Sequence, residues 1–362
     1  MTLEELRKRL SEVDRELIGL IAARQRIVAE IGAHKIRNAV PTRDYERERE
    51  VLKGAQDQAS ALGLEPDLAA EIMAVLIRYS LAHQEQSRVA AQTSGAGKRV
   101  LIIGGAGKMG AWFAQFLSSQ GFTVEVADPS DARTPFPRVA NWSDSKLDHD
   151  VIVVATPMKV AGSVLLELAE RKPKGLIVDI GSLKSPLRPG LQRLVAAGCK
   201  VTSIHPMFGP DTRLLSGRHI VFCDVGAPHA TREARALFAS TMAEQLEMSV
   251  DEHDRLMAYV LGLSHALNLA FFTALAESGE LVPRLQKMSS TTFDAQLKVA
   301  SLVATDNPHL YFEIQTLNDY GAASLNALRA AADRIHELVQ SGDEQGFVDL
   351  MAAGRRYLES RG

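Results

Sequence analysis

Apolar residues at the start of the chain recur in alternating steps of three and four, the spacing of one face of a long α-helix. They are Leu3, Leu6, Leu10, Val13, Leu17 and Leu20, and Ile27 and Ile31 continue the series. Pro41 ends this helix, a second is expected to begin near Asp44, and a third to span 66–87. Three helices in about 90 residues cannot bury so long an apolar face alone. We therefore expect this module to dimerise.

A different pattern follows a short polar spacer at 92–98. Short apolar runs, alternating with helices or loops, predict a doubly wound α/β sheet. The runs are 100–103, 123–128, 151–155, 176–180, 201–204 and 219–222. From Glu252 onward the strand pattern fades, and helices are expected that include 253–275, 317–338 and 345–358.

The predicted fold is therefore multidomain: an all-α three-helix domain, an α/β Rossmann-type domain and an all-α C-terminal domain. The boundaries we predict are 1–91 for the helical domain, 92–98 for the linker, 99–250 for the nucleotide-binding domain, and 251–362 for a helical dimerisation and substrate domain.

Composition narrows the class of protein. The 362 residues are 46% hydrophobic and 23% charged, which is ordinary for soluble proteins. We find no apolar run of the length that a membrane span needs and no signal-peptide pattern at Met1, so a cytoplasmic enzyme is expected. A net charge of -3 gives no general attraction to nucleic acid or membrane. The two cysteines, Cys199 and Cys223, provide neither a disulfide framework nor metal-ligand spacing, so no metal is predicted.

Charged residues interrupt the apolar face of the first helix. Arg24 stands where an apolar residue is expected, and Lys35, eleven residues later, returns to about the same face. A lone arginine would be a snorkelling side chain or a structural ion pair, but two cations on one stripe favour an anion site. Arg7 points about 100° away from Arg24 on the same helix, toward a partner subunit.

Polar groups on the other two helices can face the same cavity. Arg47 and Glu48 follow Asp44 by three and four residues, and Ser80 and Gln84 lie one turn apart on the third helix.

A glycine-rich turn follows the first predicted strand and opens a helix. Gly105 permits the tight turn, Gly107 lets the backbone approach a pyrophosphate, and Gly110 permits close helix packing. Asp128 ends the next strand, where it would accept from a ribose 2′-hydroxyl and repel a 2′-phosphate, so NAD is favoured over NADP; its alternative role is that of a turn residue before Pro129. The predicted cofactor-binding residues are Gly105, Gly107, Lys108, Met109, Gly110, Asp128 and Thr156.

Two histidines are candidate catalytic groups. His265 lies in an apolar run, where a core histidine is the alternative. His205 opens the run His205-Pro206-Met207-Phe208-Gly209-Pro210-Asp211.

The first 90 residues resemble the all-helical chorismate mutases in eight polar positions. These are Arg7, Arg24, Lys35, Asp44, Arg47, Glu48, Ser80 and Gln84. The resemblance implies an intertwined dimer in which the arginines bind the two carboxylates of chorismate, and Arg7 crosses into the partner's site. It further implies that Lys35 and Gln84 donate to the ether oxygen, that Glu48 accepts from the ring hydroxyl, and that Asp44 and Ser80 complete the site.

The remainder of the chain, from Arg99 to about Tyr357, resembles the prephenate dehydrogenases, and the domain order is that of the bifunctional chorismate mutase/prephenate dehydrogenase family. The His205–Asp211 run is the most specific motif. The resemblance implies that His205 takes the proton of the C4 hydroxyl of prephenate as hydride leaves for NAD, that Ser182 orients His205, and that His265 contacts substrate.

One position departs from the family. By spacing, Asp294 stands where the dehydrogenases place an arginine that binds a substrate carboxylate, and an acid cannot replace it. Lys298, Arg284 or another cation takes over, or the substrate is a 4-amino analogue whose ammonium Asp294 meets. A rival of another class is a 3-hydroxyacid-type dehydrogenase with a non-catalytic helical dimerisation or effector module. No separate domain for inhibition by tyrosine is visible.

Overall fold

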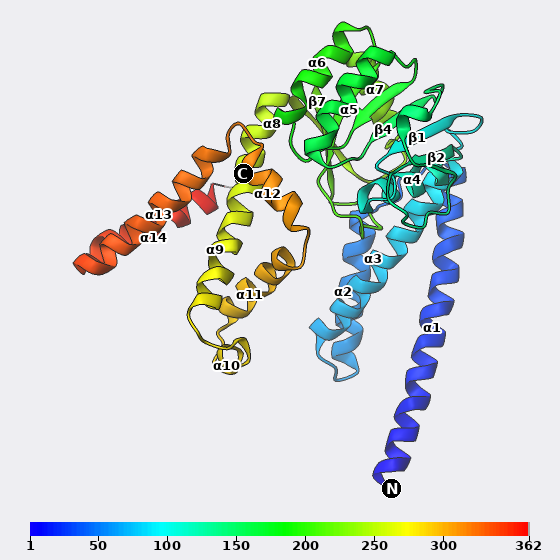
Figure 1. Ribbon diagram of the computed structural model, residues 1–362. Coiled ribbons are helices and arrows are strands. Elements are labelled where there is room, and N and C mark those ends of the chain that lie inside the picture. Colours follow the sequence, from blue (N-terminus) through cyan, green and yellow to red (C-terminus); the bar gives the residue numbers. More distant parts are fainter. Residues whose placement is uncertain (361–362) are drawn as a thin grey trace. The chain divides into compact units, whose positions relative to one another are not determined.

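The computed structural model describes residues 1–360 (Figure 1). The chain divides into two compact units, each described by itself below. The first comprises residues 1–156, 164–181 and 190–248, and the second comprises 157–163, 182–189 and 249–362.

The first unit begins with the three predicted helices, α1 (Leu3–Arg37), α2 (Tyr45–Ala61) and α3 (Pro66–Ala91). Thr2 and Glu5 form a capping box at the start of α1, and Pro66 occupies the first turn of α3. Both α1 and α2 pack on α3, but the N-terminal half of α1 extends beyond them (Figure 1). Its apolar face is open: the exposed fractions of Leu3, Leu10 and Leu17 are 64%, 62% and 50%. An exposed apolar face of this length is one that the expected dimer would bury, and that dimer stays a prediction.

The sheet of the first unit has eight strands in the order β3-β2-β1-β4-β5-β6-β7-β8. Their bounds are Arg99–Ile103 (β1), Thr123–Ala127 (β2), Arg138–Val139 (β3), Val151–Val154 (β4), Leu176–Asp179 (β5), Val201–Pro206 (β6), His219–Asp224 (β7) and Glu244–Ser249 (β8). Pairing is parallel from β3 to β6, and β7 runs antiparallel to β6. The six predicted strands are confirmed. The sequence missed β3, which has two residues, and β8, which is mostly polar.

Helices accompany this sheet: α4 (Lys108–Ser119), α5 (Met158–Arg171), α6 (Arg188–Ala196) and α7 (Pro228–Ala236), with short 3₁₀ turns at Trp142–Asp144 and Ser185–Leu187. Val100 and Ile102 of β1 belong to one core with Phe113 and Leu117 of α4 and with the residues around Phe238. Leu101 and Ile103 point to the opposite face and are also buried, so both faces of the sheet are covered.

The second unit is helical, as predicted. Its elements are α8 (Val250–Met257), a π-helical segment η3 (Ala258–Leu263), α9 (Ser264–Glu277), α10 (Val282–Lys287), α11 (Thr291–Ala304), α12 (Pro308–Thr316), α13 (Gly321–Ser341) and α14 (Glu344–Glu359). α13 and α14 pack against each other, joined by a turn in which Gly342 adopts φ 67° (Figure 1). The sequence predicted helix here but missed the π-helical segment.

One expectation needs correction. α8, η3 and α9 form a helical run, Val250–Glu277, that is long and apolar enough to cross a membrane by length and composition. The apolar pattern alone did not predict this run, because its first eight residues include four charged ones and polar residues interrupt the remainder. The core helix of a soluble protein passes the same test. Within this run Asn268 is buried, and its Oδ1 accepts from Nε2 of Gln296 at 2.9 Å.

Candidate active sites

Two of the cavity-facing residues predicted on the helical module meet directly. Nη1 of Arg24, on α1, donates to Oγ of Ser80 at 2.7 Å and to the carbonyl of Leu76 at 3.4 Å, both on α3. Arg24 is therefore neither a free snorkelling side chain nor half of an ion pair. Its charge is held at the helix seam by neutral groups and stays available to an anion.

Lys35 and Gln84 lie in the same module with donor or acceptor capacity to spare. Nζ of Lys35 donates to the carbonyl of Thr42 at 2.7 Å, which uses one of its three protons. Gln84 is buried, and its Oε1 has no hydrogen-bond partner among the described residues. Gly32 of α1 makes room for it, because a Cβ there would lie 3.0 Å from Cγ of Gln84. A buried amide with an unused acceptor is typical of a site that binds a ligand.

The residues predicted at the start of α2 have separate local roles. Asp44 is the N-cap of α2 and accepts from the backbone N–H of Arg47 at 3.0 Å. The Arg47 guanidinium pairs with Glu50 at 2.9 Å and is mostly exposed. Within one chain, Arg47 is therefore not directed at Arg24, and its predicted role stays a prediction.

Glu48 has a partner that sequence reasoning missed. Arg43 donates to both of its carboxylate oxygens, from Nε at 2.9 Å and from Nη2 at 3.0 Å. The hydrogen bond to Glu48 also raises the pKa of Arg43 above its usual value. The motif Pro41-Thr42-Arg43-Asp44 placed this arginine beside the cap, but only the fold shows the direction of its side chain.

Arg7 is exposed on the extended half of α1. Seventeen residues separate it from Arg24, which corresponds to about 25 Å along a helix. One chain therefore does not bring these two arginines together, and the predicted contribution of Arg7 to a partner's site stays a prediction.

The glycine turn of the first unit is built for close backbone approach. Gly104 has φ 83°, and a Cβ there would lie 2.7 Å from the carbonyl oxygen of Ala155. A Cβ at Gly110 would collide with the backbone of Gly104. Gly107 is the N-cap of α4 and has no side chain that could cap the helix. The backbone N–H groups of the first turn, which begins with Lys108 and Met109, are therefore available to an anion.

Two further predicted cofactor residues lie just past the carboxyl ends of β2 and β4, the two strands that flank β1. Asp128 is nearly buried; its Oδ2 accepts from the N–H of Ala106 at 3.0 Å and its Oδ1 from the N–H of Ser130 at 2.9 Å. It therefore does cap its own turn, and it is tied to the glycine turn as well. Thr156 follows β4, and its buried Oγ1 has no partner among the described residues. An unused hydroxyl beside a glycine cradle fits a bound dinucleotide.

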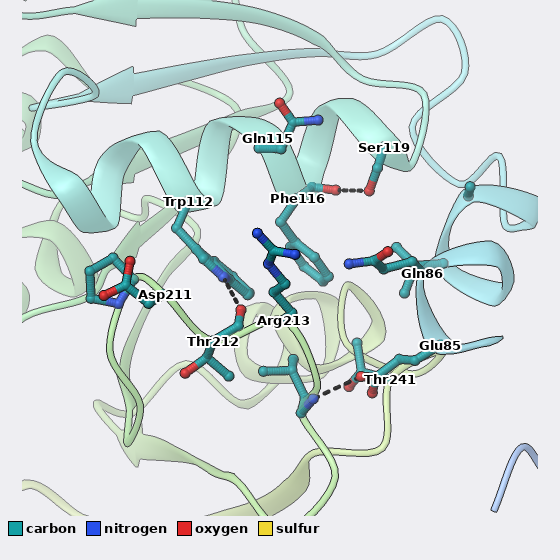
Figure 2. Close-up of a pocket in the computed structure, with 14 residues that line it drawn as sticks. Glu85, Gln86, Trp112, Gln115, Phe116, Ser119, Asp211, Thr212, Arg213 and Thr241 are labelled. Carbon is teal, nitrogen blue, oxygen red and sulfur yellow. Dashed lines mark hydrogen bonds between the residues drawn. The ribbon is translucent and has the colours of Figure 1, made fainter. Parts of the chain in front are cut away.

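His205 belongs to β6, opposite Val221 of β7, and is nearly buried. The run that follows it is anchored to α4: the ring centroids of Phe208 and Trp112 lie 5.0 Å apart, and Nε1 of Trp112 donates to the carbonyl of Thr212 at 3.0 Å. A pocket of about 650 Å³ lies beside this contact, between α3 and α4 (Figure 2). None of the predicted site residues lines it.

In the second unit, the turn that carries Ser182 is held by one buried carboxylate. Asp254 accepts from the N–H of Lys184 at 2.9 Å, and from the N–H and the Oγ of Ser185. Burial alone would raise the pKa of Asp254, but hydrogen bonds from His253, Ser185 and Lys184 outweigh it and place the pKa below its usual value. This charged anchor fixes the backbone immediately after Ser182.

His265 lies at the start of α9, directly after the π-helical segment, a feature found frequently at functional sites. Its ring stacks on Tyr311 with centroids 4.1 Å apart, and its buried Nδ1 has no hydrogen-bond partner among the described residues. Burial lowers the pKa of His265, and burial together with Asp306 raises the pKa of Tyr311. The unused ring nitrogen and the position next to the π-helical segment are compatible with a ligand contact, which stays a prediction. No local pattern predicts the ring contact with Tyr311, because 46 positions separate the two residues.

The three predicted dehydrogenase residues divide between the units: His205 in the first, Ser182 and His265 in the second. That these three side chains form one site stays a prediction. Asp294, also in the second unit, is exposed in the first turn of α11 and accepts from Oγ of Ser289 at 2.5 Å. Two cations were proposed to bind the substrate carboxylate in place of an arginine at position 294. Arg284 forms an ion pair with Glu280 at 3.2 Å, whereas Lys298 lies one helical turn after Asp294 on α11.

Comparisons with known proteins agree with this layout. Three family models match in order: chorismate mutase type II over residues 6–85, the nucleotide-binding domain of prephenate dehydrogenase over 136–243, and its dimerization domain over 249–353.

Individual relatives match over most of their length. The T-protein of Enterobacter agglomerans is 28% identical over 96% of this chain and 90% of its own. The 4-amino-4-deoxyprephenate dehydrogenase of Streptomyces pristinaespiralis is 30% identical over 73% of this chain and 92% of its own. The fold is also similar to the structure of prephenate dehydrogenase from A. aeolicus in complex with hydroxyphenyl propionate and NAD+. The TM-score is 0.56 at 18% identity, and the match covers 72% of this chain and 98% of that one.

Proposed function

From the premise that the chain belongs to the family that joins a chorismate mutase to a prephenate dehydrogenase, we propose that it performs both reactions. It rearranges chorismate to prephenate and then oxidatively decarboxylates prephenate to 4-hydroxyphenylpyruvate with NAD, on the route to tyrosine. The observation that carries the first half is Arg24, whose guanidinium donates to Ser80 on the helix that also carries Gln84, a buried amide whose Oε1 has no partner in the described part of the chain.

The mutase site needs no nucleophile and no base. A Claisen rearrangement proceeds once a flexible dianion is held in its reactive conformation and the ether oxygen, which gains charge in the transition state, receives hydrogen bonds. Arg24 would bind a carboxylate, and Lys35 and the amide N–H of Gln84 would donate to the ether oxygen. Glu48, held by Arg43, would accept from the ring hydroxyl.

A cytoplasmic homodimer completes this site in our proposal. The open apolar face of the N-terminal half of α1 gives two chains a surface to bury against each other, and Arg7 lies on that half. We propose that Arg7 reaches the site of the partner subunit, where it adds the cation that Arg24 and Lys35 alone do not supply to a second carboxylate.

The dehydrogenase residues fit a dinucleotide. Gly104 and Gly110 leave a cradle that side chains would fill. Among residues 1–360, no side chain caps the N-terminus of α4 and none bonds to the Thr156 hydroxyl. When bound, NAD supplies the hydride acceptor. Asp128 would accept from the ribose hydroxyl, and His205 would take the C4 hydroxyl proton of prephenate, after which loss of the ring carboxylate as CO2 makes the ring aromatic. Ser182, on the turn held by Asp254, would orient His205, and His265 would contact substrate.

A second candidate has two observations in its favour. Asp294 stands where a carboxylate-binding arginine is expected, and one relative is named as a 4-amino-4-deoxyprephenate dehydrogenase. The same chemistry on 4-amino-4-deoxychorismate and 4-amino-4-deoxyprephenate would place an ammonium within reach of an acid. All eight mutase positions and His205 suit the ordinary substrates, which we therefore favour.

The test is a steady-state assay of the purified chain with chorismate, prephenate and their 4-amino analogues, each with NAD and NADP. We expect turnover of chorismate and of prephenate with NAD. A general base with a pKa near neutrality contributes roughly 10² to 10⁴ in rate, so His205→Asn should lower prephenate oxidation by that factor while chorismate rearrangement continues. Turnover of the amino analogues with almost none of prephenate would establish the second candidate instead.

A further inference from the structure

We infer that Arg43 is a positioning residue of the mutase site, and that the nucleotide-binding domain holds it in place through the segment Leu215-Ser216. This inference rests on the proposed mutase activity. It assigns to the second domain a structural part in the first domain's reaction.

Arg43 is fixed on three sides. Its Nε and Nη2 bind the two carboxylate oxygens of Glu48 at 2.9 and 3.0 Å, and its Nη1 donates to Oγ of Ser216 at 2.5 Å. Its Cζ lies 4.4 Å from the centroid of the Tyr45 ring. A guanidinium bound by a fork on one edge, a hydroxyl on the other and a ring on its face has little freedom to move.

This fork fixes the plane of the Glu48 carboxylate. A glutamate near the start of a helix can otherwise rotate about three side-chain bonds, and a carboxylate that must accept from a substrate hydroxyl gains from being held in one orientation. Each carboxylate oxygen has about two acceptor positions, so one on each oxygen stays available when Arg43 uses the other. Arg43 would thus orient Glu48 without blocking it.

The segment Leu215-Ser216 also forms a hydrogen bond with α3. Glu85 follows Gln84 directly, is 3% exposed, and accepts from the N–H of Leu215 at 2.7 Å and from the N–H of Met242 at 2.5 Å. Burial raises the pKa of Glu85, so its charged form depends on these two donors. Leu215 and Ser216 therefore contact α3 beside Gln84 and the start of α2 beside Glu48.

The segment itself belongs to the dehydrogenase half of the chain. It follows the His205–Asp211 run, and Trp112 of α4 holds Thr212 by a hydrogen bond to its carbonyl (Figure 2). Glu85, which accepts from the N–H of Leu215, lies at the other side of the same view. The mutase acceptor is therefore positioned by a chain of contacts whose far end lies in the nucleotide-binding domain, all within the first compact unit.

The experiment compares three changes with one control. Arg43→Gln removes the fork, Arg43→Lys keeps the charge without the fork, and Ser216→Ala removes the acceptor at the far end. Arg49→Gln is the control, because Arg49 is an exposed arginine of α2, the helix that carries Glu48. Each variant is assayed for chorismate rearrangement and for NAD-linked oxidation of added prephenate, and its thermal unfolding is recorded.

A misplaced catalytic group costs on the order of 10²-fold in rate. We expect Arg43→Gln to lower the mutase kcat by about that factor, with a smaller change in KM and with prephenate oxidation unchanged within about twofold. Arg43→Lys should recover part of the loss, Ser216→Ala should lower mutase kcat several-fold without altering prephenate oxidation, and Arg49→Gln should match the wild type in both activities.

Other outcomes would overturn the inference. Wild-type mutase kcat in Arg43→Gln would show that Arg43 does not position Glu48. Wild-type kcat in Ser216→Ala would remove the second domain from the account. A parallel loss of both activities with a lowered unfolding temperature would show a general structural role. Absence of chorismate rearrangement in the wild type would overturn the proposed function itself, which separates that failure from the others.

Discussion

At the scale of single residues, three of the predicted site residues have unused hydrogen-bonding capacity in buried places. Gln84, Thr156 and His265 each have a buried polar atom without a partner among the described residues. Such an atom costs roughly 1 to 3 kcal/mol if nothing ever binds it. One belongs to each predicted function: chorismate rearrangement, dinucleotide binding and contact with the oxidised substrate.

His265 makes stability depend on pH. Burial places its pKa below the ordinary value of 6.5, so the folded state binds a proton less readily than the unfolded chain. Stability should be full above about pH 6.5 and should fall as the pH drops from there toward the folded pKa. Thermal unfolding measured from pH 8 to pH 5 checks this: His265→Gln should lose less unfolding temperature over that range than the wild type. An equal loss would mean that other groups account for the effect.

Asp294 separates the two candidate substrates. If prephenate is the substrate and a cation such as Lys298 binds its carboxylate, Asp294→Arg should leave the KM for prephenate unchanged or lower it, and Lys298→Ala should raise it. If Asp294 meets an ammonium, Asp294→Arg should raise the KM for the 4-amino analogue by tenfold or more, because it places two cations together. Steady-state kinetics with both substrates distinguishes the cases.

At the scale of elements, the chain shows which contacts a sequence encodes locally. The step of three and four along α1, the apolar strand runs, and the glycine turn between β1 and α4 all follow from residues close together in the chain, and the structure has them where the pattern predicts. Arg24 and Ser80 were also predictable as neighbours, because each lies on the inward face of its own helix.

Other features depend on contacts between distant parts of the chain. The two partners of Glu85 are 130 and 157 residues away, and Arg43 and Ser216 are 173 residues apart. No local pattern predicts such pairs. The π-helical segment before His265 was missed for a similar reason, since its extra residue changes only the local hydrogen-bond spacing, and β8 was missed because it is mostly polar.

The choice between NAD and NADP is predicted from the end of β2, where Asp128 contacts the glycine turn. We expect the wild type to prefer NAD over NADP by at least tenfold, because Asp128 at the end of β2 would repel a 2′-phosphate. Asp128→Ala should narrow that preference, measured as the ratio of kcat/KM values. The same change should also weaken the binding of NAD, because the Asp128 carboxylate accepts from the N–H of Ala106 in the glycine turn. An unchanged ratio would assign Asp128 to the turn alone.

At the scale of the whole molecule, one chain carries two reactions in series. The helical module and the sheet form one compact unit, joined at Leu215 and Ser216. The two sites nevertheless use different residues, so we expect them to be separable by mutation. This separability distinguishes a bifunctional enzyme from a dehydrogenase that merely carries a helical dimerisation module.

The most direct test of the account is therefore Arg24→Ala, assayed for both activities in the same preparation. Loss of the cation that Ser80 holds should abolish chorismate rearrangement, because one substrate carboxylate loses its partner, while NAD-linked oxidation of added prephenate stays largely intact. Circular dichroism and the unfolding temperature should stay close to the wild type. Unchanged rearrangement, or an equal loss of both activities in a folded protein, would contradict two separate sites in one chain.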